Sequence, residues 1–542
     1  MSRLLRINGF DIDIDDNTAI GITLQSYDIK EPNKRKSSIT NSFTIPLTIT
    51  NNHIFGYPNN IHSTSKRIYE PLVADYWVNG YQLITKGIVR VEEVSDRITL
   101  FLVQKLDLWD NLKLITWPQF AQEYIDWINP QLQVSYSQLI YDSVNSESGL
   151  FLPCWLGQLS TQLSEDGSYY IEDTANLWLQ YKEINGGHFA IYAKSIFEFI
   201  EYKYNVKFLT SGGVFGGNIF DDEFVKNIYT PIRSLGVKAV YNSTTGAHEG
   251  FKLAFIGNDF KPLESGDKTD KTLHDFVTAF FQVFNVIVEE VGDEIRLARW
   301  DELINQPPIE WTEKLSDGVI KFKPSINGYT QSNKIKFGSI FEGGSEDLNS
   351  KIISCLNKNL DAKSDLFTID ANIPPFVQSY GGIIPNLSDA KTFETFQFFI
   401  SAYESEGVKA KTTAYIATHF DDGVTKESAL NYMQMPSVYS IENEYQLLSK
   451  VLEYPEYREL SCWLTINDIV NLRFYAQYWF NQLGGSYFIN KIAGFNPTKS
   501  LVATKLELIK VSDKSPTTPP NIDYYVDGVN DGFTDGIGDL FY

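Results

Sequence analysis

Residues 27–60, YDIKEPNKRKSSITNSFTIPLTITNNHIFGYPNN, contain the pattern that decides the fold class of this chain. A basic run at 34–36 leads into Ile39–Ile45, where every second residue is expected to face inward. This alternation predicts a strand with one buried face, and Pro46 ends the strand because proline has no N–H to donate to a neighbour. A loop rich in Thr and Asn is expected to follow, up to Phe55-Gly56.

Further strands are predicted on both sides of this stretch. Residues 3–29 contain two apolar runs of period two, separated by a turn at 15–17. Asn79-Gly80 lies between two alternating runs, and it is a strong hairpin signal because both residues tolerate the positive φ of a type I′ turn. One more strand at 97–103 leads into residues 106–109. Five or more short strands at this spacing predict a small barrel or sandwich.

The clearest local signal is a helix that begins after Thr272. Thr272 is a good N-cap, Asp275 stands three residues further on, and apolar residues recur at helical spacing over Leu273–Phe284. Asn285 can adopt the left-handed conformation that ends a helix. A hairpin is expected directly afterwards, over residues 286–298. The aromatic stripe on this helix is typical of core packing.

Two other regions have a readable pattern. A second helix is predicted over 191–204, and it also ends at an Asn. Clean alternation over residues 487–492 and 503–511 predicts a closing hairpin. Beyond Val511 the composition changes to a stiff Pro/Thr linker and then to a tail with repeated Asp-Gly turns.

The composition sets limits on size and on partners. With 542 residues, the chain is long enough for several domains of roughly 100–200 residues each. Aromatic residues make up 14% of the chain against only 3 Met, which favours sheet over helix. The formal net charge of −22 disfavours non-specific attraction to a polyanion and so argues against a DNA-coating role. An acidic surface would suit a conduit along which DNA slides without sticking.

Cysteine usage and hydropathy point to the cytosol. Cys154, Cys355 and Cys462 lie far apart and form no C-x-x-C pair, so they are expected to be small buried hydrophobes. The N-terminus has no apolar stretch of signal-peptide length, and no run reaches the roughly 18 apolar residues of a membrane span. The sequence predicts a protein that is made and stays soluble in a reducing cytosol.

Motifs for catalysis or metal binding are missing from the sequence. There is no H-E-x-x-H, G-x-S-x-G or P-loop motif, and the six His show no metal-ligand spacing. A calcium loop at 11–16 is disfavoured, because Asp16 stands where such a loop needs glycine, and the Asp-Gly tail lacks alternating oxygen ligands. Paired carboxylates for glycoside hydrolysis cannot be read from sequence because they are set by distance in space. We predict no enzyme activity, no cofactor and no metal.

Three stretches, 27–110, 272–340 and 460–511, resemble the tail hub (baseplate hub) proteins of tailed bacteriophages. The first contains a basic run that leads into an F-T-I-P strand, followed by an N-N-x-I-F-G loop and an N-G hairpin. It ends in an L-D-L-W segment, which is a short helix in that family. The second carries an F-F-x-x-F-N-V-I helix-to-hairpin, and the third ends in G-x-Y-F-I-N-K-I and K-L-E-L-I-K-V, like the last strands of the family's second barrel. The resemblance is strongest to phages of Bacteroidetes-type gut bacteria, including the crAss-like phages.

The resemblance implies a mainly β fold with an α+β insertion, that is, two small β-barrel domains of phage hub type plus a mixed α/β region. The implied domains are a first β-barrel domain at 1–115, a mixed α/β insertion at 116–265, a helix plus β-hairpin at 266–315, a second β-barrel domain with an insertion at 316–511, and a linker with an extended C-terminal arm at 512–542.

The function implied is that of a virion structural protein, which forms a tail hub ring around the DNA exit channel and an attachment platform for other tail proteins. Its partners would be itself in a symmetric ring, other tail proteins (the tail tube or ring, fibres, a second hub protein), and DNA that passes through without sequence-specific binding. The protein would reside in the virion tail, and in the host cytoplasm during assembly.

Two alternatives from other classes stay open. One is a tail-associated cell-wall or polysaccharide hydrolase, for which residues 116–265 are the region that could hold a site. The other is a receptor- or glycan-binding tail module that uses surface Tyr and Trp. Clearing on a peptidoglycan or capsule zymogram would favour the first, and binding to a glycan array would favour the second.

Residues 516–542 are predicted to form an assembly arm. Their Pro/Thr linker and Asp-Gly turns cannot bury enough apolar area to order themselves, because each fixed residue costs about 1–2 kcal/mol of backbone entropy. Aromatic anchors seated on a neighbouring subunit are a usual way for such an arm to gain order. The anchors expected at this interface are Tyr524, Tyr525, Phe533, Ile537, Leu540, Phe541 and Tyr542.

Overall fold

The computed structural model describes most of the N-terminal region and separate segments of the remainder. The ranges described are 2–25, 27–28, 31–35, 38–104, 107–128, 151–155, 162–163, 169–170, 187–209, 228–232, 235–241, 243–246, 248–255, 271–291, 294–299, 307–324, 329–338, 350–372, 396–400, 402–405, 408–411, 445–474, 476–499 and 502–512.

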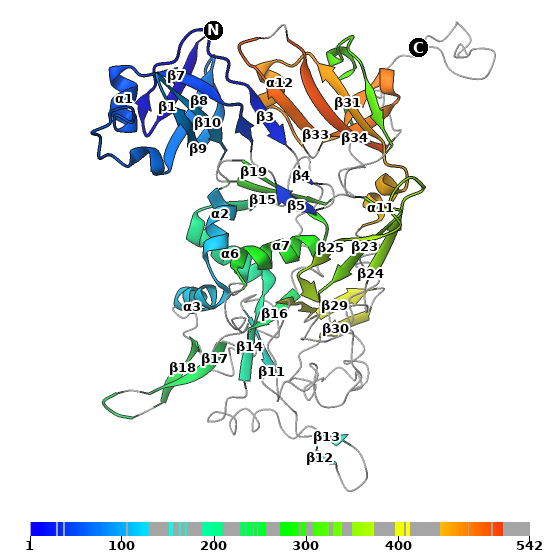
Figure 1. Ribbon diagram of the computed structural model, residues 1–542. Helices are drawn as coiled ribbons and strands as arrows, with labels where there is room; N and C mark the ends of the chain where they lie inside the picture. The colour runs from blue at the N-terminus through cyan, green and yellow to red at the C-terminus, as the bar shows by residue number, and fades with distance from the viewer. Residues whose placement is uncertain are drawn as a thin grey trace, which may run out of the picture.

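One 14-stranded sheet dominates the molecule (Figure 1). Its main path runs through β2 (Phe10–Asp11), β1 (Arg3–Ile7), β8 (Leu72–Val78), β9 (Tyr81–Val94), β10 (Arg97–Val103), β6 (Ile39–Thr40), β3 (Ile22–Gln25), β33 (Gly485–Phe495), β34 (Thr504–Ser512), β31 (Tyr457–Cys462) and β22 (Lys321–Lys323). Two branches leave this path: β7 (Phe43–Pro46) pairs with β10, and β32 (Tyr478–Phe480) joins β33 to β21 (Ile309–Glu310). Strands from the beginning of the chain therefore continue directly into strands from its end.

The strands from β2 to β3, together with α1 (Ile49–Phe55) and the 3-10 turn η1 (Arg67–Tyr69), form what we call the first β unit. The predicted Asn-Gly hairpin is confirmed, since Asn79 (φ 52°) and Gly80 (φ 84°) make the turn between β8 and β9. The buried core of this unit includes Leu5, Ile7, Ile20, Ile22, Phe43, Ile45, Ile54, Phe55, Leu72, Tyr76, Ile98 and Leu100.

The strand predicted at Ile39–Ile45 is present, in two pieces. β6 and β7 pair in turn with successive parts of β10, antiparallel to it. Phe43 and Ile45 are buried, as predicted. Ile39 and Asn41 are exposed, so the prediction of one inward face along the whole strand is wrong for its first half.

The change of face is explained by Asn41. Its side-chain oxygen accepts a hydrogen bond from the Gly21 N–H, and its amide donates to the Ala19 carbonyl at 3.3 Å. These bonds draw Asn41 toward the neighbouring segment and interrupt the ladder. Thr40 is then the buried residue, and its hydroxyl accepts a hydrogen bond from the Leu102 N–H at 2.8 Å.

Residues after Pro46 form helix α1, where a loop is predicted from the sequence. The Thr48 hydroxyl caps the helix by accepting a hydrogen bond from the Asn51 N–H at 3.2 Å, and Gly56 ends it at a φ of 75°. A Thr N-cap and a Gly past the last turn are the sequence signal of a helix. With seven residues, α1 is too short for an apolar period to reveal it.

The strands from β33 to β22, with the branch β32–β21, form the second β unit. It also contains α12 (Ile466–Val470), η6 (Thr312–Lys314) and η8 (Asn481–Leu483). The predicted closing hairpin is confirmed as the antiparallel pair β33 and β34. The buried core of this unit includes Trp311, Leu460, Cys462, Leu464, Tyr478, Phe480, Tyr487, Ile489, Ile492, Phe495, Leu506 and Leu508.

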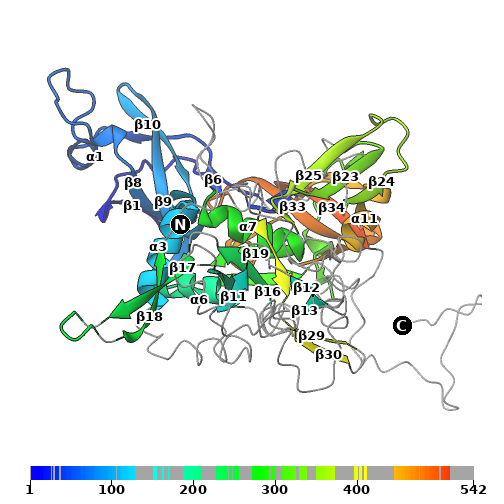
Figure 2. The same cartoon turned by 90° about the horizontal axis from the view of Figure 1, so that it is seen from below.

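The two β units meet at a seam where β3 pairs antiparallel with β33. Ile22 lies opposite Phe495, and Leu24 lies opposite Ile492. Leu24 packs against the cores of both units, as does Ile466 from α12. The units therefore lie side by side, on either side of the seam, in both views (Figures 1 and 2).

A helical layer lies beneath the two units in Figure 1. Its helices are α2 (Asp107–Leu114), α3 (Trp117–Ile128), α6 (Ala193–Tyr204), α7 (Leu273–Val283) and α11 (Gln446–Glu453). The predicted helices at 191–204 and 272–284 are confirmed as α6 and α7. Phe280 of α7 is fully buried, and its ring centroid lies 5.1 Å from Phe197 of α6 and 5.8 Å from Phe398. The aromatic stripe of α7 is therefore core, as predicted.

Both helices lead into the same small sheet. Asn205 (φ 51°) follows α6 and Asn285 (φ 49°) follows α7, each in the left-handed conformation. The strands after them, β15 (Lys207–Leu209) and the hairpin β19 (Val286–Val291) with β20 (Glu294–Arg299), form one three-stranded sheet. The hairpin of β4 (Tyr27–Asp28) and β5 (Glu31–Arg35), which holds part of the basic run, reaches from the first β unit to contact β19 and α7.

The other described strands form smaller sheets. They are β23 (Ser332–Phe337) with β24 (Ser350–Ser354) and β25 (Ser364–Ile369); β11 (Phe151–Trp155) with β14 (Gly187–Tyr192), β16 (Ile228–Ile232) and β28 (Phe399–Ile400); and the pairs β12 (Gln162–Leu163) with β13 (Tyr169–Tyr170), β17 (Leu235–Tyr241) with β18 (His248–Phe255), β26 (Ala371–Asn372) with β27 (Phe396–Gln397), and β29 (Ala402–Ser405) with β30 (Val408–Lys411).

The fold is thus mainly β with helices, as predicted. The two small β-barrels are not shown: among the described strands, no pairing closes either β unit, and both are consecutive parts of one open sheet. Cys355 and Cys462 are buried and unpaired, as expected. Within the described part of the chain, no helix is long and apolar enough to cross a membrane.

Candidate functional site

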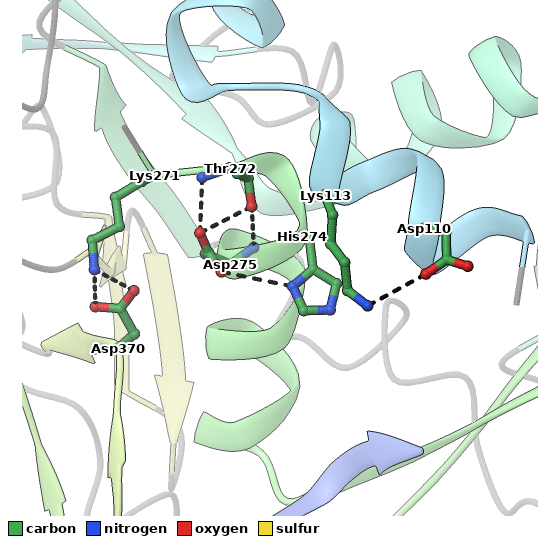
Figure 3. A network of polar contacts seen from close by, with 7 residues as sticks. All are labelled: Asp110, Lys113, Lys271, Thr272, His274, Asp275 and Asp370. Atoms are coloured by element: carbon green, nitrogen blue, oxygen red, sulfur yellow. Dashed lines mark hydrogen bonds and ion pairs between the residues drawn. The ribbon is translucent and has the colours of Figure 1, made fainter. Parts of the chain in front are cut away.

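The N-terminus of α7 carries a network of polar contacts (Figure 3). The Thr272 hydroxyl accepts a hydrogen bond from the Asp275 N–H at 3.2 Å, and the Asp275 carboxylate accepts one from the Thr272 N–H at 2.9 Å. This reciprocal pair is the capping box that the sequence predicts, and it satisfies two N–H groups that the helix leaves free. Asp275 also lies 3.6 Å from Nδ1 of His274.

Lys271 ties this helix start to a neighbouring sheet. Its Nζ lies 2.6 and 2.5 Å from the two carboxylate oxygens of Asp370, which stands between β25 and β26. On its other side, the Lys271 carbonyl accepts a hydrogen bond from the Trp117 N–H at 2.6 Å. The segment before α7 is therefore fixed both to the start of α3 and to the end of β25.

The two acids of this site have opposite pKa shifts. Burial raises the pKa of the Asp370 carboxyl to about 6, although Lys271 acts against the shift. Burial also acts to raise the pKa of Asp275, but contacts with His274 and Thr272 outweigh it and hold that pKa below its ordinary value. Both acids already have partners, and the amine of Lys271 is engaged by Asp370. This arrangement holds elements together and presents no unpaired base or nucleophile.

The described residues include no group of three or more His, Cys, Asp or Glu placed to hold a metal ion. The acidic residues of the rejected calcium loop have other partners: Asp11 pairs with Arg6, Asp13 accepts from the Thr48 hydroxyl, and Asp15 pairs with Arg97.

A second candidate site is a surface, formed by residues 48–70. We call it the α1–η1 lobe, since it comprises α1, the following loop and η1, and it lies at the outer side of the first β unit (Figures 1 and 2). Ile49, Ile61 and Tyr69 have exposed fractions of 86%, 92% and 82%. The sequence predicts a loop after Pro46 and therefore does not reveal this surface. The capping signal of Thr48 and Gly56 was the available clue.

The lobe holds its shape through short-range bonds. The Ser63 hydroxyl donates to the Gly56 carbonyl at 2.8 Å, and the Arg67 guanidinium donates to the His53 carbonyl at 3.2 Å. Gly56 is closely packed, since a Cβ placed on it would lie 2.7 Å from the Ser65 Cβ. The loop is thereby fastened to the end of α1.

The two ends of the large sheet are a third candidate surface. β2 and β22 end its main path, and Phe10 and Phe322 on them are about half exposed. The Arg458 guanidinium lies 4.6 Å from the Phe322 ring centroid, and Lys323 pairs with Glu459. Among the described strands, nothing pairs with the outer side of β2 or β22. Such edges can be extended by another chain.

The interface residues predicted from the sequence fall outside the described residues, so their role stays a prediction. They are Tyr524, Tyr525, Phe533, Ile537, Leu540, Phe541 and Tyr542.

Comparison with known proteins gives distant structural likenesses. No family model matches the chain, and no curated protein matches it. Among solved structures, the chain is similar to a 43 kDa tail protein of prophage MuSo2 from Shewanella oneidensis, with 10% identity and a TM-score of 0.36 over 96% of this chain and 100% of that chain.

Two further solved structures are similar to the same degree. One is a tail protein from Neisseria meningitidis MC58, with 8% identity and a TM-score of 0.31 over 95% of this chain and 98% of that chain. The other is the prophage tail protein gp18 from Listeria monocytogenes EGD-e, with 5% identity and a TM-score of 0.34 over 96% of both chains. Because all three TM-scores lie below 0.5, no property of these proteins is transferred to this chain.

Proposed function

We propose that this chain is a structural protein of a phage tail, a hub subunit that forms a symmetric ring around the DNA exit channel and a platform for other tail proteins. The observation that carries the proposal is the seam between β3 and β33. Two β units from opposite ends of the sequence lie side by side as one sheet. Side-by-side β modules are what the resemblance to hub proteins implies for the wall of a ring.

The open ends of the sheet fit this role. A ring of identical subunits needs a head-to-tail contact, in which one end of a subunit meets the opposite end of the next. The strands β2 and β22 are such opposite ends, each with an unpaired outer side among the described strands. For a stable ring, each contact must bury well over about 1,000 Å² in total.

The charge of the chain is compatible with the proposal. A net charge of −22 disfavours adhesion to the phosphate backbone, which suits a channel that DNA leaves through. In this account, DNA passes without sequence-specific binding. The subunit assembles in the host cytoplasm and then resides in the virion tail, in contact with the tail tube or ring, the fibres and a second hub protein.

The domain division belongs to the same proposal. We place a first β module at 1–115, a mixed insertion at 116–265, a helix and hairpin at 266–315, a second β module at 316–511 and an arm at 512–542. In its most specific form, the proposal is that the two modules correspond to the two β-barrels of a hub protein close to those of crAss-like phages.

Genetic removal tests the proposal. A phage genome with a stop codon early in this gene, grown in a non-suppressing host, is expected to produce filled heads without complete tails. Supplying the intact gene from a plasmid is expected to restore infectious particles. Complete, infectious tails without the protein would contradict the proposal, and purified chain that clears a peptidoglycan or capsule zymogram would favour the hydrolase alternative.

A further inference from the structure

The α1–η1 lobe combines exposed apolar and exposed basic side chains in an otherwise acidic chain. Single exposed apolar residues are normal on a protein surface, but Ile49, Ile61 and Tyr69 lie on one short lobe and are each more than four-fifths exposed. Such a grouping is typical of a surface that another chain covers. The hydrogen bonds from Ser63 and Arg67 already fix the loop, so little conformational entropy would be lost on binding.

The same lobe carries cations that the described structure does not neutralise. Lys66 and Arg67 are exposed, and neither takes part in an ion pair with any described residue. Glu70 is the one acidic residue within 48–70, against 68 acidic and 46 basic residues in the whole chain. The lobe therefore attracts an acidic ligand with apolar side chains.

The C-terminal segment of this chain has the complementary composition. Residues 516–542 contain no Lys or Arg, and acidic residues recur at every fourth position: Asp523, Asp527, Asp531, Asp535 and Asp539. Aromatic residues stand between them, at Tyr524, Tyr525, Phe533, Phe541 and Tyr542. The composition of this segment, acidic and aromatic, thus complements the basic and apolar side chains of the lobe.

The placement of the chain ends favours a contact between copies. The described chain ends with β34 in the second β unit, whereas the lobe lies at the outer side of the first unit, across the large sheet (Figure 1). In a head-to-tail contact, the second unit of one copy comes next to the first unit of the next copy. The 30 residues after Ser512 can span up to roughly 100 Å when extended, which is ample for a neighbour's lobe.

We infer that the α1–η1 lobe is the docking surface for residues 516–542 of a neighbouring copy of this chain. This inference rests on the proposed ring, and it adds to it the site at which the C-terminal arm is held. Lys66 and Arg67 pair with the aspartates of the arm, and Ile61 and Tyr69 contact its aromatic side chains.

Site-specific crosslinking in the full-length chain tests the inference. The photoreactive residue p-benzoylphenylalanine replaces Tyr69, and assembled rings or tails are made from a mixture of ¹⁵N-labelled and unlabelled copies. Mass spectrometry is expected to find crosslinks from position 69 to peptides of residues 516–542. Products that join a labelled peptide to an unlabelled one show that the two peptides come from different copies. The same probe at Tyr454, which is also exposed but lies directly after α11 of the helical layer, is expected to give none of these crosslinks.

A charge-reversal pair separates docking from general effects. The variant Lys66→Glu, which leaves the Arg67 bond to the His53 carbonyl in place, is expected to lower the crosslink yield at least two-fold. The matched variant Lys358→Glu changes the net charge equally at an exposed lysine between β24 and β25, and it is expected to leave the yield unchanged. Equal yields in the two variants would overturn the electrostatic part of the inference.

The outcomes also separate this inference from the proposed function. Intact rings in which Tyr69 crosslinks only to other segments, to another protein or within its own copy would overturn the docking site while the ring stands. Absence of any ring or tail containing the chain would overturn the proposed function and the docking site together.

Discussion

At the scale of single residues, the raised pKa of Asp370 predicts how the stability of the chain depends on pH. Its pKa rises from 3.8 to about 6, so the folded chain holds a proton there between about pH 4 and 6 that the unfolded chain releases. The stability from this group is fully present below pH 4 and is lost as the pH rises through 6. We expect the melting temperature of the wild type to fall relative to Asp370→Asn between pH 4 and 7.

The control for this prediction is Asp361→Asn, which removes an exposed carboxylate in the loop before β25. Melting temperatures of the three proteins are compared at pH 4, 5, 6 and 7. If the difference between wild type and Asp370→Asn is the same at every pH, the environment assigned to Asp370 is wrong.

Gly56 gives a second test at the same scale. It has a φ of 75°, and a Cβ would lie 2.7 Å from the Ser65 Cβ, whereas Gly80 has a φ of 84° with no atom within 4 Å of its Cβ position. A left-handed conformation alone costs a non-glycine residue about 1–2 kcal/mol. We expect Gly80→Ala to lower the free energy of unfolding by that amount and Gly56→Ala to lower it more, as measured by urea denaturation.

The excess cost at Gly56 is assigned to the collision with Ser65. Adding Ser65→Gly to Gly56→Ala is therefore expected to recover part of the lost stability. An equal cost for Gly56→Ala and Gly80→Ala would show that the α1–η1 lobe is less closely packed than described.

At the scale of elements, the seam between β3 and β33 is the contact on which the architecture depends. Leu24 is half-buried and packs against the cores of both β units. We expect Leu24→Ala to lower the free energy of unfolding by about 1–3 kcal/mol, at the lower end of the range for truncating an apolar side chain. Hydrogen exchange should accelerate at residues 22–25 and 491–495 but not along β9 and β10.

The control for the seam is Val73→Ala, which truncates an exposed apolar residue on β8. It is expected to leave exchange at the seam unchanged. Acceleration confined to the first β unit after Leu24→Ala would mean that the two units are not coupled through this residue.

Elements with local signals could be predicted from the sequence, and contacts between distant segments could not. The Asn79-Gly80 hairpin and the capped helix α7 follow from residues a few positions apart. The pairing of residue 22 with residue 495 does not, because many alternating strands could pair equally well by pattern alone. Asn41 shows the same limit within one strand, since its bonds to Gly21 and Ala19 reverse the buried face.

The candidate surfaces divide in the same way. The aromatic residues of 516–542 can be identified from composition, as can the charge of that segment. The α1–η1 lobe could not, because the exposure of Ile61 and Tyr69 depends on how the loop folds back on α1. Composition thus predicts an arm, and only the fold indicates where a neighbour could receive it.

At the scale of the whole molecule, three features bear on assembly. The chain builds one open sheet from its two ends, a helical layer with an aromatic core lies beneath it, and the net charge is −22. The main path of the sheet ends at β2 and β22, whose outer sides are unpaired among the described strands, so a single copy leaves interaction surfaces uncovered. A ring of copies would cover them.

Electron cryo-microscopy of intact tails tests this central claim most directly. The account predicts a closed ring of several identical copies on the tail axis, in which the β units of neighbouring copies alternate around the DNA channel. A particle in which this chain is present as a single copy, or sits away from the axis, would contradict it.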